Sequence, residues 1–209
     1  MKKQLAIIGT FGLLVNMNCA MMINDPDNTG DTSTIHTTRS YSINTESYFP
    51  FENNTNWWKF SEASGNPCAI KIVDTISDDF ITYYRVSFME NRVDTTDDWF
   101  KRSSGDILFG TSLTGIYDRF LPSRIESQGG RYTCGSNVIN YEYFDSAVIN
   151  GLTFKRVISL QYDTPVIHGF DKILFAEKIG VIMMQDLDGR WPVSYVLDSC
   201  SISGTVSRF

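Results

Sequence analysis

Histidine is scarce in this chain, and the motifs that many metal and redox enzymes need are missing. The 209 residues contain two histidines, His36 and His168, far apart in the sequence. No Cys-x-x-Cys pair occurs, which argues against a zinc ribbon and against a thioredoxin-type redox site. We therefore expect no bound metal and no cofactor.

Positive charge is also in short supply. The sequence has 18 Lys and Arg against 24 Asp and Glu, a formal net charge of -6. Surfaces that bind nucleic acid or anionic membranes need clustered Lys and Arg side chains. We therefore expect no nucleic-acid partner and read the acidic balance as a contribution to solubility.

The chain has one long apolar run, Leu5–Val15, and it follows Lys2 and Lys3. A basic start and an apolar run of this length are typical of a secretory signal peptide, and the run is short for a bilayer span. We predict a signal peptide over residues 1–20 and export to the periplasm, the outer membrane or the cell surface. A single-pass anchor is the alternative.

Cys19 lies just after the apolar run, where bacterial lipoproteins carry the cysteine that becomes acylated. Such signals favour an aliphatic residue three positions earlier and a small residue directly before the cysteine, whereas this chain has Asn16 and Asn18. Two readings stay open. Acylation of Cys19 would give the protein a lipid anchor, its one contact with a membrane, and cleavage near Cys19 or Ala20 would release a soluble exported protein.

Residues 21–47 are mostly Asn, Asp, Thr and Ser. Such a composition buries too little apolar surface to offset chain entropy, so we expect a flexible tether there and a folded domain over residues 48–209. The domain holds Cys68, Cys134 and Cys200. An oxidising compartment allows one disulfide among them, in any of three pairings, with one thiol left over.

Helical periodicity is missing from the domain, because no apolar stripe with a 3.6-residue period runs beyond about two turns. Apolar residues alternate instead, as in strands. The dipeptide Asn150-Gly151 is a type I′ hairpin signal that joins the expected strands Tyr141–Ile149 and Leu152–Tyr162. The predicted cross-strand pairs are Ile149 with Leu152, Ala147 with Phe154, Tyr143 with Ile158, and Tyr141 with Leu160. In this register Asp145 lies across from Arg156, an opposite-charge pair.

A second hairpin signal, Asp188-Gly189, lies near the end of the chain. A two-residue turn there pairs Met184 with Val193 and Ile182 with Tyr195. One face of this hairpin is then apolar and faces the core. Its members are Ile182, Met184, Trp191, Val193, Tyr195 and Leu197.

The remaining pattern indicates several more short strands. We expect strands at Ala69–Thr75, Phe80–Met89, Ile107–Ser112, Ile116–Leu121 and Ser201–Phe209, and an acidic turn at Asp94–Asp98. Sequential strands with tight turns predict a mainly β protein. The expected fold is a single antiparallel up-and-down meander curled into a half-barrel or barrel, with a two-sheet β-sandwich as the alternative.

Two short motifs bracket most of the domain. Near its start, Tyr48-Phe49-Pro50 precedes a polar loop and Trp57-Trp58, and near its end Phe175–Ile182 reads as a strand of the form aromatic-Ala-x-x-aliphatic-Gly-aliphatic-aliphatic. This arrangement resembles exported bacterial proteins and lipoproteins of unestablished function. Residues 52–56 replace the usual glycine of the first loop. The resemblance implies an antiparallel β domain in the cell envelope and brings no catalytic residues.

Catalytic patterns are weak. The segment Gly110–Gly115 misses the Gly-x-Ser-x-Gly spacing of a serine nucleophile by one residue. His168 and paired carboxylates leave an envelope hydrolase as the alternative function. The sequence also has three acidic clusters, none with the spacing of a calcium-binding EF-hand loop. They are Asp74, Asp78 and Asp79; Asp94, Asp97 and Asp98; and Asp186 and Asp188.

Aromatic residues are the most suggestive feature, with four Trp, ten Tyr and fourteen Phe. A half-barrel could gather them around a concave apolar cavity, as in the envelope's half-barrel lipoprotein carriers, to which the expected fold is similar. The residues predicted to bind a ligand are Trp57, Trp58, Phe88, Trp99 and Trp191. We expect a non-enzymatic binding module for a lipid, another apolar ligand or an envelope protein partner. A structural surface protein with a filled core is a further alternative.

Overall fold

The computed structural model describes residues 40–209, apart from 52–53, 63–66, 79, 91–92, 164–169 and 187–192. In these ranges the chain is almost entirely antiparallel β-structure, and its single helical element is a 3-10 helix, η1, at Glu46–Tyr48. Within the same ranges no helix has the length and apolar content that crossing a membrane requires. The mainly β prediction is confirmed.

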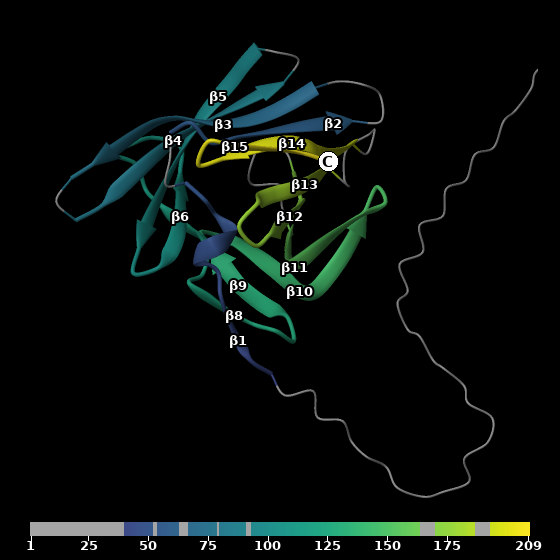
Figure 1. The fold of residues 1–209 in the computed structure, drawn as a ribbon. Helices are drawn as coiled ribbons and strands as arrows, with labels where there is room; N and C mark the ends of the chain where they lie inside the picture. Colours follow the sequence, from purple (N-terminus) through teal and green to yellow (C-terminus); the bar gives the residue numbers. More distant parts are fainter. Residues whose placement is uncertain are drawn as a thin grey trace, which may run out of the picture. The chain divides into compact units, whose positions relative to one another are not determined.

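The fifteen strands follow one another closely along the chain (Figure 1). Their bounds are β1 Ser42–Asn44, β2 Trp57–Glu62, β3 Pro67–Ser77, β4 Thr82–Glu90, β5 Val93–Ser103, β6 Asp106–Gly110, β7 Asp118–Leu121, β8 Arg124–Glu126, β9 Gly130–Cys134, β10 Asn137–Ile149, β11 Leu152–Tyr162, β12 Lys172–Ala176, β13 Gly180–Asp186, β14 Val193–Ile202 and β15 Thr205–Arg208.

Thirteen of the described strands form one sheet: twelve follow the order of the chain around it, and β15 pairs with β14 at its side. Strands β2 to β7 pair in sequence, β9 to β14 pair in sequence, and β14 returns to pair with β2. This is the predicted up-and-down meander, nearly closed into a barrel. One seam stays unsealed between β7 and β9, because β8 leaves the sheet to pair with β1.

A side-chain hydrogen bond bridges the seam where a backbone ladder is missing. The hydroxyl of Tyr132 on β9 donates to the carbonyl of Phe120 on β7. The two edges also approach closely at Gly135, where a Cβ atom would come within 2.7 Å of the Asp118 carboxylate. The two ends of the sheet therefore meet without pairing, which keeps it curled.

The hairpin at Asn150-Gly151 forms as predicted. Both turn residues have positive φ, 49° and 80°, as a type I′ turn requires. All four predicted pairs are present: Ile149 with Leu152, Ala147 with Phe154, Tyr143 with Ile158, and Tyr141 with Leu160. Local turn chemistry was enough to fix the register of this pair of strands.

The predicted ion pair within this hairpin is wrong. Arg156 has a φ of 52°, which takes it out of regular strand geometry, and its Nη1 pairs with Glu177 Oε2 at 3.1 Å. The carboxylate of Asp145 instead accepts a hydrogen bond from the Tyr41 hydroxyl at 3.2 Å. Arg156 and Asp145 thus interact with other residues, although the register of the hairpin places them opposite one another.

The register of the last hairpin differs from the prediction. Met184 pairs with Tyr195, and Asp186 pairs with Val193, a shift of two residues from the expected pairing. The predicted register needed a backbone N–H from Pro192, which proline lacks. Residues 187–192, with Asp188-Gly189 and Trp191, lie outside the described residues. A shift of two keeps every side chain on its face, so Met184 and Tyr195 are buried as expected.

Three smaller expectations need correction. Asp94–Asp98 belongs to β5 rather than to a turn, because β5 pairs with β4 along this stretch. The strand expected to start at Phe80 starts at Thr82, so Phe80 lies outside β4 and is 94% exposed, whereas Tyr84, Val86 and Phe88 of β4 are buried. Packed structure also begins before Tyr48, because Ile43 of β1 is 2% exposed within the stretch read as a tether.

The late motif Phe175–Ile182 is a turn between two strands, not one strand. β12 ends at Ala176 and β13 starts at Gly180, and these two residues pair. The intervening Lys178 has a φ of 64° and Gly180 a φ of 89°. The glycine of the motif therefore supplies a left-handed backbone conformation that other residues adopt at a cost.

All three cysteines of the domain are buried, and none of them forms a disulfide. Cys68 on β3 and Cys200 on β14 lie on the two strands that flank β2, so about 9.5 Å of sheet separates them, beyond disulfide reach. Cys134 lies on β9, at the seam. Burial raises the pKa of the Cys134 thiol to about 11, with a smaller contribution from the Asp118 carboxylate.

Gly180 and Gly151 form a matched pair for testing the turn geometry. A Cβ at Gly180 would come within 3.0 Å of Trp58 Nε1, whereas a Cβ at Gly151 meets nothing within 4 Å. Gly151→Ala should lower the free energy of unfolding by about 1–2 kcal/mol through backbone strain alone. Gly180→Ala should lower it by about 3 kcal/mol, because packing strain adds to it. Urea denaturation measures both, and equal losses would contradict the close packing of Trp58 on the turn.

Candidate functional site

The interior of the barrel holds an apolar cavity. The volume of this cavity is about 50 Å³. That volume is more than the ~10–15 Å³ that one water molecule needs. Half of the cavity's sixteen lining residues are aromatic: Tyr48, Phe49, Phe51, Trp58, Phe88, Phe100, Phe120 and Phe175. The cavity therefore offers aromatic and aliphatic contacts with few polar groups.

The segment that follows β1 forms one wall of this cavity. We call residues 45–51 the plug segment, because its rings lie among side chains from distant strands. The Phe49 ring lies 5.5 Å from that of Phe100 on β5, 5.4 Å from Phe120 on β7 and 5.3 Å from Phe175 on β12. Phe51 packs beside it, 5.3 Å from Phe100. The plug segment thus contacts both halves of the sheet, the half made of β2 to β7 and the half made of β9 to β14.

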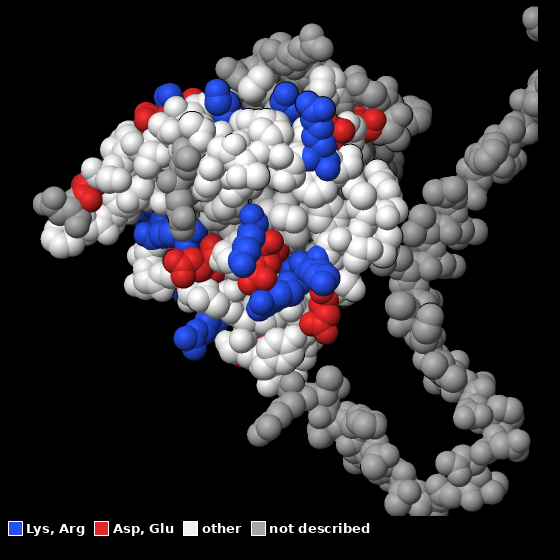
Figure 2. Space-filling view, in the orientation of Figure 1, with Lys and Arg blue, Asp and Glu red and all other residues white. Residues whose placement is uncertain are grey.

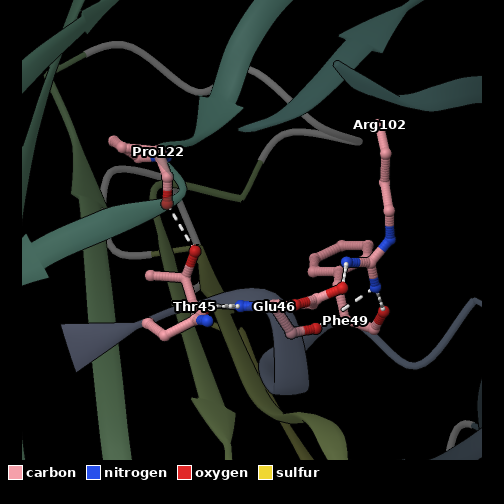
Figure 3. A network of polar contacts seen from close by, with 6 residues as sticks. Thr45, Glu46, Phe49, Arg102 and Pro122 are labelled. Carbon is pink, nitrogen blue, oxygen red and sulfur yellow. Dashed lines mark hydrogen bonds and ion pairs between the residues drawn. The ribbon is translucent and has the colours of Figure 1, made fainter. Parts of the chain in front are cut away.

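Arg102 of β5 and the turn after β7 hold the plug segment in place (Figure 3). Arg102 Nη2 donates to the carbonyl of Phe49 at 2.8 Å and to that of Glu46 at 3.2 Å. Its Nη1 also lies 3.5 Å from the Glu46 carboxylate. The Thr45 hydroxyl donates to the carbonyl of Pro122. Arg102 therefore satisfies two backbone carbonyls of a segment that belongs to no ladder, and the buried Thr45 side chain ties the segment to the turn after β7.

The two sequence motifs meet at the opposite side of the plug segment. The backbone N–H of Lys178 donates to the carbonyl of Ser47 at 2.7 Å. Trp58 Nε1 donates to the carbonyl of Ile179 at 2.5 Å. The Tyr-x-Pro segment, the tryptophan strand and the Ala-x-x-Ile-Gly turn therefore form one contact, although more than a hundred residues separate the first two from the third.

The residues predicted to bind a ligand divide between the two faces of the sheet. Trp58 and Phe88 line the cavity. Trp57 and Trp99 are half-buried and lie on the outer face, next to the inward-facing Trp58 and Phe100, because neighbours in a strand point to opposite sides. Trp191 lies outside the described residues. The ligand-binding role itself stays a prediction.

Sequence reasoning missed the main aromatic residues of the cavity. The sequence patterns give Phe49 and Phe175 places in the two motifs but no ligand-binding role, and they do not single out Phe51, Phe100 or Phe120. A signal was present, because four apolar residues at Tyr48–Phe51 include no alternating polar position, unlike a half-exposed strand. Nothing local, however, shows which distant rings such a segment contacts.

The carboxylates expected for a hydrolase do not converge. Asp97 and Asp98 are neighbours on β5 and point to opposite faces: Asp97 lies 3.8 Å from Arg85 on the outside, and Asp98 lines the cavity. In the described part of the chain no three His, Cys, Asp or Glu side chains come together as a metal site would need. His168 lies outside the described residues.

The outer surface carries mixed charge. Figure 2 shows basic and acidic side chains beside one another on the face that it draws. Ion pairs among the described residues include Arg119 Nε with Asp106 Oδ2 at 2.8 Å. Such exposed pairs contribute little to stability because water and salt screen them.

Comparison with protein-family models gives no match, and comparison with curated proteins gives none either. Two crystal structures share a likeness at 10% identity. One is a candidate exported protein from Bacteroides fragilis described as having a YMCC-like fold, with a TM-score of 0.38 over 77% of this chain and 99% of that one. The other is a candidate lipoprotein from Parabacteroides distasonis, with a TM-score of 0.37 over 77% of this chain and 98% of that one. At values this low, the function of this chain has to be judged from its own residues.

Arg102 can be tested as the anchor of the plug segment. Arg102→Met removes two charge-assisted hydrogen bonds to backbone carbonyls and should lower the free energy of unfolding by about 2–3 kcal/mol. Arg119→Met, the matched control, removes an arginine whose side chain is 53% exposed from its ion pair and should cost less than about 1 kcal/mol. Urea denaturation of both variants measures the difference. Equally small losses would show that Arg102 does not hold the segment.

Proposed function

We propose that this protein is an exported envelope protein that binds an apolar small molecule inside its barrel, beside the plug segment. The observation that carries the proposal is the cavity itself, which aromatic rings from both halves of the sheet line. Concave, mostly apolar sites of this kind are the usual places for such ligands.

The energetics of an empty cavity support the same proposal. A cavity costs roughly 24 cal/mol per Å³ in lost packing. A volume of about 50 Å³ therefore costs on the order of 1 kcal/mol if nothing fills it. An apolar ligand would offset that cost and would bury its own surface away from water.

Export and anchoring rest on the first twenty residues, which lie outside the described part of the chain. Lys2, Lys3 and the apolar run Leu5–Val15 are the features of a secretory signal. We propose that the protein is exported to the cell envelope and that acylation of Cys19 anchors it there. The ligand site would then be held close to a membrane surface by the N-terminal residues.

Filling the cavity should abolish ligand binding. Val181 is buried on β13 and lines the cavity, so Val181→Phe places a ring where the ligand would lie. Isothermal titration with 1-octanol should give an affinity at least about tenfold lower than for the unaltered protein. Val206→Phe adds the same ring at a position on β15 that is 57% exposed, and it should leave the affinity unchanged. Binding of octanol by neither the parent protein nor the control would sink the proposal.

The anchor can be tested by fractionating cells that express the full chain. Cys19→Ala removes the one thiol next to the apolar run and should move the protein from the membrane fraction to the soluble fraction. Cys68→Ala removes a buried thiol of the domain and should leave the distribution as it was. A Cys19→Ala protein that stays with the membranes would rule out anchoring through this residue.

A further inference from the structure

We propose that the outer face of β3 to β6 contacts the membrane surface, with Phe80 and Ile116 entering the headgroup region of the bilayer. This inference goes beyond ligand binding and concerns the outside of the barrel. Phe80 is 94% exposed and Ile116 is 87% exposed, the two highest values among the large apolar side chains of the described residues. Exposed apolar residues scattered singly are ordinary, whereas these two are held in place beside other apolar side chains.

A hydrogen-bonded turn holds Phe80 in solvent at the tip of the hairpin between β3 and β4 (Figure 1). Asp78 Oδ1 accepts hydrogen bonds from the backbone N–H groups of Phe80 at 3.1 Å and Ile81 at 2.7 Å. The Asp78 N–H donates in turn to the Ile81 carbonyl at 3.0 Å. An aspartate side chain bonded to the backbone two residues on is an Asx turn, which fixes the local backbone. The turn therefore presents the Phe80 ring to the surroundings.

Ile116 lies beside the same part of the sheet. The residue after it, Tyr117, has its ring 6.0 Å from that of Tyr83, which follows Phe80 by three positions. The loop after β6 folds back onto the sheet, because the Ile116 carbonyl would lie 3.0 Å from a Cβ atom at Gly110. The two protruding side chains therefore flank one pair of aromatic rings.

The face between them has the composition of a membrane interface. Lys101 pairs with Tyr83 across the sheet, and its Nζ lies 4.1 Å from the centre of the Tyr117 ring. The same row of the sheet continues with Ile76, which is 38% exposed, on one side and the half-buried Leu108 on the other. Tyrosine and lysine side chains combine an apolar body with a polar end, and tyrosine is enriched where a bilayer meets water.

The N-terminal part of the chain favours a bilayer as the partner of this face. The choice rests on the proposed anchoring through Cys19, which residues 20–39 join to the start of the described domain. Twenty residues span at most about 70 Å, so an anchored domain stays close to the membrane and meets it at a high effective concentration. Asp78 keeps the contact shallow, because burial of its carboxylate in hydrocarbon would cost free energy.

Fluorescent labels at three positions test this contact on the full-length chain. Cys19→Ala leaves three cysteines, all buried, so an added surface cysteine is the thiol that an environment-sensitive nitrobenzoxadiazole label reaches. In separate chains the added substitution is Phe80→Cys, Ile116→Cys or Val148→Cys. With excess phosphatidylcholine vesicles, the labels at 80 and 116 should shift their emission to the blue, and lipids brominated near the headgroup should quench them.

Val148 is the matched control, because it is 70% exposed but lies on β10, outside this face. Its label should keep the emission that it has in buffer. All three positions are exposed, so the substitutions should leave the fold intact, and urea denaturation checks this. Each label reports on its own position, so its response does not depend on whether the N-terminal residues also bind the vesicles.

Three results would overturn the membrane contact. The first is a label at 80 or at 116 that does not respond to vesicles, and the second is an equal response from the label at 148. The third is a blue shift that grows with protein concentration when vesicles are absent, because the face would then bind a second copy of the chain. Octanol binding is measured separately, so the ligand site inside the barrel would stand in each case.

Discussion

The packing of Phe49 against rings from both halves of the barrel is the contact on which the rest of the structure depends. A closed sheet widens with each added strand, and about eight strands enclose an interior that side chains just fill. This sheet has twelve strands around its interior. The extra space needs a filler, and the plug segment supplies it with Tyr48, Phe49 and Phe51, all buried. The cavity is the space beside these rings that the segment leaves open.

This constraint explains why the two motifs of the sequence occur together. A segment inside a barrel lacks a strand ladder, so other groups must satisfy its backbone. Arg102 and the Lys178 amide do so from opposite sides of the plug segment. Gly180 has no side chain where Trp58 packs, which lets the tryptophan reach the Ile179 carbonyl. The residues of the two motifs therefore pack together, hold the plug segment in place and border the cavity.

The sequence predicted those parts of the fold that local chemistry decides. Asn150-Gly151 sets its own turn geometry, and the register of its hairpin followed correctly over the whole length of both strands. The last hairpin kept its buried face but not its register, because Pro192 excludes the pairing that a two-residue turn demands. Strand alternation is also enough to predict that Trp57 and Trp58 lie on opposite faces of the sheet, since adjacent residues of a strand point to opposite sides. Local sequence patterns thus predict which face of a strand is buried and where a tight turn forms.

The interior could not be predicted in the same way, because it depends on contacts between residues far apart in the chain. Phe49 meets Phe120 and Phe175, and nothing near Phe49 in the sequence identifies these partners. The inward position of Asp98 likewise followed only once the turn expected at Asp94–Asp98 proved to be part of β5. A segment outside the strand ladder has an apolar sequence much like that of a strand. The residues that it contacts can be identified only from the structure.

Xenon is the most direct probe of the central claim, that the space beside the plug segment is hollow and apolar. Xenon enters dry apolar cavities and needs no hydrogen-bond partner there. A crystal structure under xenon pressure should show a bound atom among Phe49, Phe88 and Phe175. An interior that takes up no xenon, or one that ordered waters fill, would contradict the account.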